Sequence, residues 1–177
     1  MPAATPFTIA IEQSRLDDLT DRLRRAHLAS DYANEHWEYG TNGAYLRELI
    51  DYWISGFDWR KQETAINRLS HFRVNLQGIP VHFAIEKGVG PDPLPLVLTH
   101  GWPWTFWDFN QVIGPLTNPA AFGGDPADAF DVVVPSLPGY VFSTPLVVPG
   151  VNWWKTADLW ASHGGRSRLR AIRRARK

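Results

Sequence analysis

The sequence contains no cysteine and only one methionine among its 177 residues. The lack of cysteine excludes disulfide bonds, thiolate metal sites and cysteine nucleophiles, and it favours a reducing, cytoplasmic location. No apolar run reaches the roughly 18 residues that a membrane-spanning helix needs. The start of the chain, MPAATPFTIA, lacks the basic and then apolar pattern of a secretory signal. We therefore expect no membrane segment.

The formal net charge is zero, but the charges are divided unequally along the chain. Residues 161–177 hold six Arg and one Lys without any acidic residue, whereas the remaining residues include 11 basic and 18 acidic ones. The basic stretch has no interleaved aromatic residue and follows no recognisable nucleic-acid-binding fold, so we expect no nucleic acid partner. We interpret 161–177 as a tail that is disordered or translated from a shifted frame. A basic arm that binds a polyanion is the alternative.

The composition is that of a globular protein, with 44% hydrophobic residues and with nine Trp, nine Phe and five Tyr available for a core. Hydrophobic residues recur at helical spacing over 15–28, over 44–55 and again after Asp58, which is a good N-cap. Ser14, three residues before Asp17, resembles a capping box at the start of the first helix. We therefore predict that residues 1–70 form a mainly helical N-terminal segment.

From residue 72 the hydrophobic pattern changes to one typical of strands. Four segments alternate or are continuously apolar: 72–76, 79–85, 94–98 and 130–134. Pro80 lies in the second segment and is tolerable there if that strand is at an edge. The third, 94–98, is apolar throughout, as in a central strand covered on both faces. With a crossover helix over 106–116, this order predicts a mixed, mostly parallel α/β sheet in residues 71–160.

A candidate site follows the third predicted strand, because ligands of open α/β sheets bind beyond the carboxyl ends of the strands. In the sequence His100-Gly101-Trp102-Pro103, Gly101 allows a tight turn, and the amide of Trp102 can point at a reacting oxygen as half of an oxyanion hole. Pro103 fixes the turn and is a candidate for a cis bond. An ordinary tight turn with an aromatic cover is an equal alternative from these residues alone.

The remaining polar residues point to no other chemistry. The six histidines form no metal-ligand motif, so we predict no metal site. His82 lies on a predicted strand, and we interpret it as a structural residue rather than a base. Ser136 and Ser143 are not in the G-x-S-x-G context of a serine hydrolase.

Four stretches of the chain together resemble a known family: FDWRKQE, FRVNLQGIPVHF, LVLTHGWPWTFWDF and DAFDVVVPSLPGYVFS. In this order and at this spacing they are similar to the N-terminal half of epoxide hydrolases of the microsomal and juvenile-hormone type, in the α/β-hydrolase superfamily. The resemblance covers residues 5–160. It implies an incomplete α/β-hydrolase core at 71–160, preceded by an N-terminal segment that wraps the core.

The resemblance also implies a reaction, the hydrolysis of a small apolar or aromatic epoxide to a diol. In the family, an Asp carboxylate opens the ring to form an ester, Tyr side chains of a helical lid protonate the epoxide oxygen, and a His activates the water that releases the diol. The amide matching Trp102 helps to hold the oxyanion of the second step, with His100, Gly101 and Pro103 shaping the loop. No metal or organic cofactor takes part.

The chain departs from the family beyond PSLPGY, where a small-x-Asp-x-small elbow should carry the nucleophile. Residue 160 is instead followed by ASHGGRSRLRAIRRARK. We therefore expect no catalytic residue in this chain and no activity from it alone. Val141 also stands where the family usually has Gly. Two alternatives stay open: a sibling activity such as ester or haloalkane hydrolysis, and a non-catalytic half that pairs with a separate C-terminal part.

Overall fold

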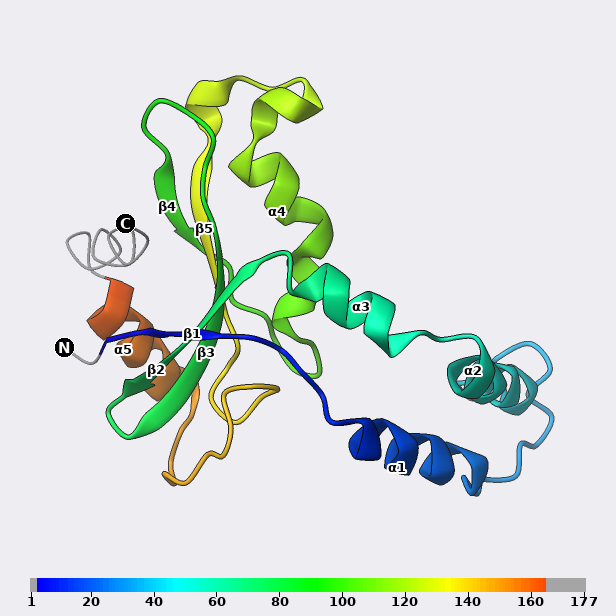
Figure 1. Cartoon of the computed structure of the whole chain (residues 1–177). Coiled ribbons are helices and arrows are strands. Elements are labelled where there is room, and N and C mark those ends of the chain that lie inside the picture. Colours follow the sequence, from blue (N-terminus) through cyan, green and yellow to red (C-terminus); the bar gives the residue numbers. More distant parts are fainter. Residues whose placement is uncertain (1–2, 165–177) are drawn as a thin grey trace. The chain divides into compact units, whose positions relative to one another are not determined.

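The computed structural model describes residues 3–164, which form two compact units (Figure 1). One unit joins the start of the chain, through Thr8, to the residues from Ile66 onward, and the other is Ile9–Ala65. Over the described residues, no helix has both the length and the apolar character to cross a membrane. Most of the basic tail, 165–177, lies outside the described residues, so its interpretation stays a prediction.

The unit Ile9–Ala65 contains the three helices that the hydrophobic spacing predicts. They are α1 (Gln13–Arg24), α2 (Gly43–Ser55) and α3 (Trp59–Ile66). The predicted cap at Asp58 is confirmed, because its Oδ1 accepts the Lys61 N–H at 3.0 Å. The predicted capping box at Ser14 is wrong. Glu12 precedes the helix without a side-chain cap bond, and Asp17 accepts instead from the Gln13 side chain at 2.9 Å.

The same unit has a bridging carboxylate and an open apolar pocket. Oε1 of Glu63 accepts the backbone N–H of Ile11 at 2.7 Å and the indole N–H of Trp59 at 3.1 Å. The bond to Ile11 joins the start of the unit to α3, and the bond to Trp59 lies within that helix. The pocket has a volume of about 500 Å³, and its lining includes Leu16, Leu23, Trp53 and Phe57.

The other unit is built on a mixed sheet, as the sequence predicts, but the sheet has a fifth strand, at Thr5–Phe7, that was not predicted. Its strands are β1 (Thr5–Phe7), β2 (Ser70–Leu76), β3 (Ile79–Glu86), β4 (Leu94–Val97) and β5 (Phe130–Pro135), in the order β1-β2-β3-β5-β4. We expected mostly parallel strands, but in the described sheet only β4–β5 is parallel. Parallel neighbouring strands need a crossover connection, and the described sheet contains a single strand–helix–strand unit of this kind.

The β2–β3 hairpin turns at Gln77 and Gly78, whose φ values of 54° and 85° are those of a two-residue hairpin loop. We expected Pro80 to require an edge strand. However, β3 lies between β2 and β5. The proline is tolerated because the β3–β5 ladder spans only Phe83–Glu86, so Pro80 has a neighbouring strand on one side alone.

β4 lies at an edge of the described sheet, as the incomplete core predicted from the sequence implies, although the apolar composition of 94–98 by itself favours a central strand. Its parallel pairing with β5 agrees with the prediction. Leu94 and Val97 expose 60% and 37% of their surface, although the sequence of the strand is wholly apolar. Leu94 donates its N–H to the carbonyl oxygen of Ala129, just before β5, and Leu98 donates to that of Val133, so the alternate backbone groups of Pro95 and Val97 face the open edge.

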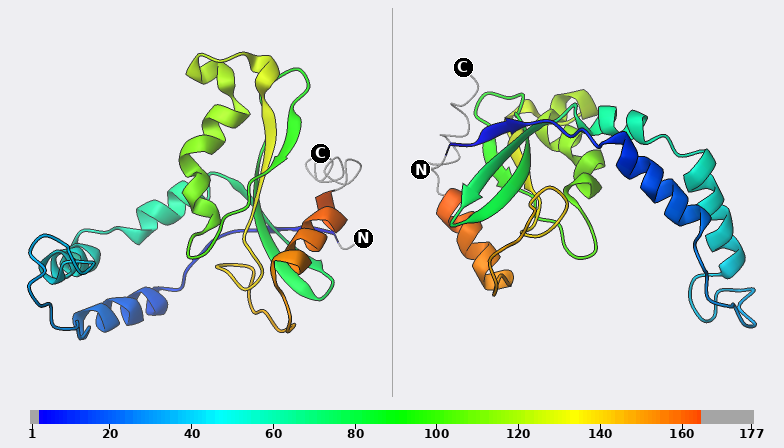
Figure 2. Two further views of the ribbon diagram at one scale, coloured as in Figure 1. Left: turned by 180° about the vertical axis from the view of Figure 1, so that it is seen from behind. Right: turned by 60° about the horizontal axis from the view of Figure 1, so that its bottom comes forward.

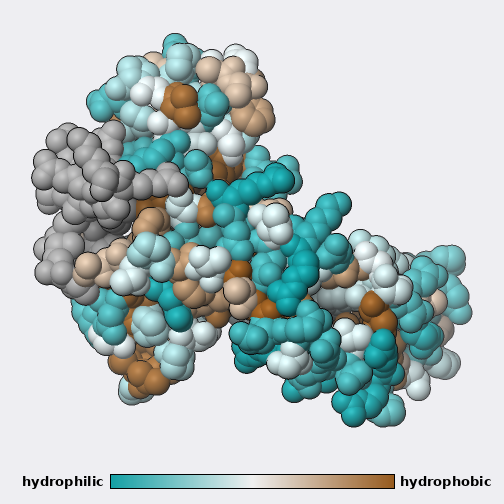
Figure 3. Space-filling model, in the orientation of Figure 1, coloured by the Kyte–Doolittle hydropathy of each residue, from teal (hydrophilic) through white to brown (hydrophobic). Residues whose placement is uncertain are grey.

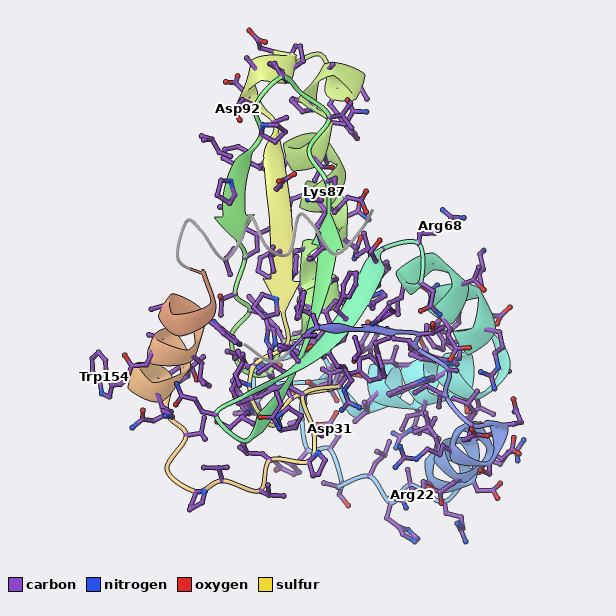
Figure 4. The ribbon with its side chains drawn as sticks, turned by 60° about the vertical axis from the view of Figure 1, so that its left-hand side comes forward. Arg22, Asp31, Arg68, Lys87, Asp92 and Trp154 are labelled. Carbon is purple, nitrogen blue, oxygen red and sulfur yellow. The ribbon has the colours of Figure 1, made fainter. Side chains whose placement is uncertain are left out.

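Helices cover both faces of the sheet, with α4 on one face and α5 on the other (Figures 1 and 2). The crossover consists of a short 3-10 helix η1 (Phe106–Phe109) and α4 (Asn110–Thr117), and two further 3-10 turns, η2 (Pro119–Phe122) and η3 (Pro126–Asp128), lead to β5. α5 (Trp153–Gly164) places the fully buried Leu159 against the inner residues of β2 and β3. Trp154, on the same helix, points away from the sheet (Figure 4) and is 78% exposed.

The surface is mixed rather than uniformly polar. On the face drawn in Figure 3, hydrophobic residues interrupt the polar surface in several places. The hydrophobic side chains that the fold does bury lie mainly on β2, β3 and β5, and β3 is covered on both faces. The core of the sheet unit is therefore centred on β3.

Candidate functional site

The turn after β4 has the predicted tight form. The N–H of Trp104 donates to the carbonyl oxygen of Gly101 at 2.9 Å, and the Trp102–Pro103 peptide bond is cis, as considered from the sequence. A turn with a cis proline at its third position is a type VI β-turn. Gly101 itself does not have a positive φ, and a Cβ there would meet no atom within 4 Å. The turn is therefore formed by the proline and the hydrogen bond, and not by the conformational freedom of Gly101.

His100 is buried and joins this turn to the segment after β5. Its Nδ1 lies 3.0 Å from the carbonyl oxygen of Gly101, and its Nε2 lies 3.0 Å from the backbone nitrogen of Leu137. A carbonyl oxygen only accepts and a backbone N–H only donates, so Nδ1 carries the proton and Nε2 accepts. A neutral imidazole in this one tautomer satisfies both bonds.

The amide of Trp102 belongs to the peptide group that His100 holds. The carbonyl oxygen of Gly101 accepts from both His100 and Trp104, and in a trans peptide the following N–H points the opposite way. Over residues 3–164, no hydrogen bond uses this N–H of Trp102. The Trp102 side chain is 75% exposed. The turn thus presents an oriented, unused donor at the carboxyl end of a parallel strand.

A second polar cluster lies inside the sheet unit and was not among the candidate sites predicted from the sequence. His82 on β3 places Nδ1 2.9 Å from Oγ of Ser136 and Nε2 3.1 Å from Nδ1 of His71 on β2. His71 Nε2 in turn lies 2.9 Å from the carbonyl oxygen of Ile66. His82 and Ser136 are both fully buried.

The hydrogen bonds of this cluster run in one direction. The carbonyl oxygen of Ile66 can only accept, so His71 carries its proton on Nε2 and accepts on Nδ1. His82 must then donate from Nε2, which leaves its Nδ1 to accept the hydroxyl proton of Ser136. Every ring nitrogen is satisfied when both rings are neutral.

The surroundings keep both rings neutral. Burial lowers the pKa of His82 to about 3, with His71 and Arg73 acting in the same direction. Burial also lowers the pKa of His71, against the opposing effect of its bond to Ile66. The rings of Phe7, Phe106 and Phe142 stand edge-on to His82 at centroid distances of 5.5, 5.0 and 5.2 Å.

The Ser136–His82–His71 arrangement has the connectivity of a serine hydrolase triad, but it does not suit that chemistry. Ser136 has no exposed surface, so a substrate cannot reach its hydroxyl. A histidine with so low a pKa is a poor general base near neutral pH. The interpretation of His82 as a structural residue therefore fits this geometry.

The sequence did contain a signal for the histidine pair. A two-residue turn at Gln77-Gly78 fixes the hairpin register, in which Arg73 stands opposite His82. His71 is two residues from Arg73 and therefore on the same face, diagonal to His82 and within reach of a long side chain. Over the described residues, no group of three or more His, Cys, Asp or Glu is arranged to hold a metal ion.

Comparisons with known sequences agree on one family. The family model described as Epoxide hydrolase N terminus matches residues 4–109. A protein of Stigmatella aurantiaca (strain DW4/3-1), whose name places it provisionally among the epoxide hydrolases, is 40% identical over 157 residues, or 89% of this chain and 36% of its own length. Epoxide hydrolase 1 of Oryctolagus cuniculus is 35% identical over 159 residues, or 88% of this chain and 35% of its own length. The chain thus spans about a third of these relatives.

Solved structures agree with this result. The juvenile hormone epoxide hydrolase of the silkworm Bombyx mori superposes with a TM-score of 0.80 at 26% identity, covering 96% of this chain and 40% of that chain. The epoxide hydrolase of Aspergillus niger gives a TM-score of 0.77 at 29% identity, covering 90% and 42%. The predicted fold, an incomplete α/β-hydrolase core with its N-terminal segment, is confirmed.

Proposed function

The chain belongs to the epoxide hydrolase family, and we propose that it supplies the N-terminal portion of an enzyme that hydrolyses an epoxide to a diol. Its matched region, residues 4–109, contains the whole turn from His100 to Pro103. The substrate class that the resemblance implies is a small apolar or aromatic epoxide. In this proposal the chain contributes a binding element, and the reacting side chains come from the part of the enzyme that follows.

The observation that carries the proposal is the unused N–H of Trp102. In the family's reaction, a carboxylate oxygen attacks a ring carbon, the C–O bond breaks, and the alkoxide takes a proton from a lid tyrosine. Water, after giving a proton to a histidine, then attacks the carbonyl carbon of the resulting ester, and the carbonyl oxygen becomes an oxyanion. A fixed N–H aimed at that oxygen stabilises the charge without reorganising, which is the largest single contribution in many acyl-transfer sites.

His100 acts in this proposal as a positioning residue. It holds the Gly101 carbonyl from one side of the peptide group, so the Trp102 N–H on the other side is fixed before the substrate arrives. Its second bond, from the N–H of Leu137, fixes the turn relative to β5. Fixing a donor in advance is what makes an oxyanion hole effective.

Alone, the chain should turn over no epoxide, since an amide donor cannot open the ring without a nucleophile.

A second candidate function, a non-catalytic half that pairs with a separate C-terminal part, is favoured by the open edge of β4. There, the apolar Leu94 and Val97 are exposed, and backbone groups of Pro95 and Val97 face outward. A strand added at that edge would pair with these backbone groups and would cover the exposed apolar side chains. Mixing the chain with a separately produced C-terminal part, followed by size-exclusion chromatography, tests this pairing.

The test of the Trp102 amide uses a joined protein, in which residues 3–160 precede the part of the Bombyx mori enzyme that lies beyond the aligned region. Incorporating the α-hydroxy acid analogue of tryptophan at position 102 replaces the N–H by an ester oxygen. We expect kcat for diol formation to fall by about 10²–10³, the cost of removing one oxyanion donor. Trp102→Phe keeps the amide and serves as the control. An ester variant as active as Trp102→Phe would refute the role of the amide.

A further inference from the structure

The hydrogen-bonded chain through the two buried histidines has no part in the proposed reaction. We propose that His71, His82 and Ser136 form a latch that holds residues 136–144, here called the post-β5 segment, on β3 at neutral pH and releases it when one proton enters the cluster. The inference rests on the geometry of the cluster and is independent of epoxide hydrolysis.

The closed latch has a single arrangement of hydrogen atoms, because the group at its far end, the carbonyl oxygen of Ile66, can only accept a hydrogen bond. With the Ile66 oxygen accepting, each successive group donates toward β2, and the chain ends with the Ser136 hydroxyl donating to His82 Nδ1. At that end the post-β5 segment is joined to β3 by a side-chain bond. Two further bonds support it, since Ser143 Oγ accepts the His82 backbone N–H at 2.9 Å and donates to the Ser136 carbonyl at 2.8 Å.

A single added proton reverses the bond at Ser136, whichever ring receives it. If the proton stays on His82, its Nδ1 carries a hydrogen. If the proton resides on His71, whose Nδ1 then donates to His82 Nε2, the neutral His82 must carry its own hydrogen on Nδ1. In both cases Ser136 Oγ changes from donor to acceptor, and its hydroxyl proton loses its partner inside a fully buried site. An unpaired buried donor is costly, so protonation opens the latch.

A second proton cannot enter the closed cluster. Both rings would then direct N–H groups at each other across 3.1 Å. The elements packed on His82 offer no compensation. β2 brings His71 and Arg73, both of which oppose a positive charge, whereas β1, η1 and the post-β5 segment bring Phe7, Phe106 and Phe142. The folded cluster therefore holds at most one proton, and the unfolded chain holds two.

Arg73 on β2 also attaches the post-β5 segment to the sheet. Its Nη2 donates to the carbonyl oxygens of Phe142 and Thr144, both at 2.7 Å, so the post-β5 segment is attached at two places along its length. Two backbone N–H groups attach the segment as well, since that of Ser136 donates to the His82 carbonyl oxygen at 2.9 Å and that of Leu137 donates to His100 Nε2 at 3.0 Å. The bonds from Gly139 N–H to Ser143 O and from Ser143 N–H to Tyr140 O are internal to the segment. β2 and β3 have a full ladder from Ser70 to Ile85 and do not depend on the histidines for it.

The first measurement follows the C2–H exchange of each histidine in the full chain by mass spectrometry as a function of pH. His27 and His36 are exposed and provide the reference within the same molecule. We expect the midpoint of His82 to lie on the order of three pH units below theirs, as for a deeply buried ring. Midpoints for His71 and His82 equal to those of His27 and His36 would overturn the latch.

The second measurement compares backbone amide protection of residues 136–144 with that of residues 70–86 between pH 7 and pH 4. We expect the post-β5 segment to lose protection first, by about tenfold or more, while the hairpin stays protected. Loss of protection in both regions at one pH would overturn a local latch. His82→Gln can place an amide N–H near the Nε2 position, toward His71, but has no atom at the Nδ1 position to accept from Ser136, so protection of 136–144 should already be low at pH 7. His27→Gln is the matched control and should leave the profile unchanged.

Discussion

His100 and Gly101 are neighbours in the sequence, and the imidazole Nδ1–H of His100 donates back to the Gly101 carbonyl oxygen across 3.0 Å. This short loop of bonds fixes the orientation of a whole peptide group, and with it the N–H of Trp102. Because the other ring nitrogen accepts from Leu137, one buried side chain connects the ends of both parallel strands.

Removing the His100 ring should therefore cost both stability and the orientation of the turn. His100→Ala leaves the Leu137 N–H without an acceptor, and we expect the free energy of unfolding to fall by about 1–3 kcal/mol. In the joined protein, kcat and KM should fall together while kcat/KM changes little, because the Trp102 amide acts on the oxyanion of ester hydrolysis, which follows ring opening. Urea unfolding and initial rates measure the two effects. His36→Ala, at an exposed position, is the control, and an equal loss in both variants would contradict the prediction.

Val141 has a φ of 46°, in the left-handed region that a β-branched residue rarely adopts. The resembled family usually has Gly at this position, which fits the conformation. We expect Val141→Gly to raise the free energy of unfolding by about 1 kcal/mol, because the strain relieved exceeds the entropy that Gly adds to the unfolded chain. Val147→Gly, in an exposed loop without a positive φ, should not stabilise. If Val141→Gly instead lowered the free energy of unfolding, the Val141 side chain would stabilise the fold by more than the strain of its positive φ destabilises it.

The buried histidines predict how stability depends on pH. Burial depresses the pKa values of His71 and His82 in the folded chain, so the unfolded chain binds more protons below its ordinary histidine pKa of about 6.5. Their contribution is complete above that pH and is lost as the pH falls toward 3. Between pH 7 and 5 we expect the free energy of unfolding to fall by about 2 kcal/mol. Urea unfolding at several pH values measures this, and the double variant His71→Gln/His82→Gln should give a flatter profile. An equally steep profile in the double variant would assign the effect to other groups.

The sequence predicted the elements of this fold well where local signals were strong. The helical spacing over 44–55 predicted α2, and the alternating segments 72–76 and 79–85 predicted β2 and β3. Prediction from the sequence failed where contacts between residues distant in the sequence determine the structure. The apolar residues of β4 suggested a central strand, yet an apolar composition does not show which strands are present to cover it. The bond between His82 and Ser136 joins residues 54 positions apart, and only the sheet order brings them together.

α5 provides a test of the sheet unit itself. Leu159 has no exposed surface and packs against the inner residues of β2 and β3, whereas Trp154 on the same helix is 78% exposed. We expect Leu159→Ala to lower the free energy of unfolding by about 2–5 kcal/mol. Trp154→Ala should change it by about 0.5 kcal/mol or less. Denaturant unfolding of the two variants in parallel measures the difference, and similar losses would mean that α5 does not pack as described.

The most direct test of the account is to measure diol formation from styrene oxide by chromatography, using equal concentrations of the chain alone and of the joined protein. We predict that the joined protein, once shown to unfold cooperatively, forms the diol and that the 177-residue chain alone forms none above the uncatalysed rate. Diol formation by the chain alone would contradict the proposal that this portion lacks the reacting groups. A folded joined protein without activity would contradict the proposal that residues 3–160 supply a working N-terminal portion of an epoxide hydrolase.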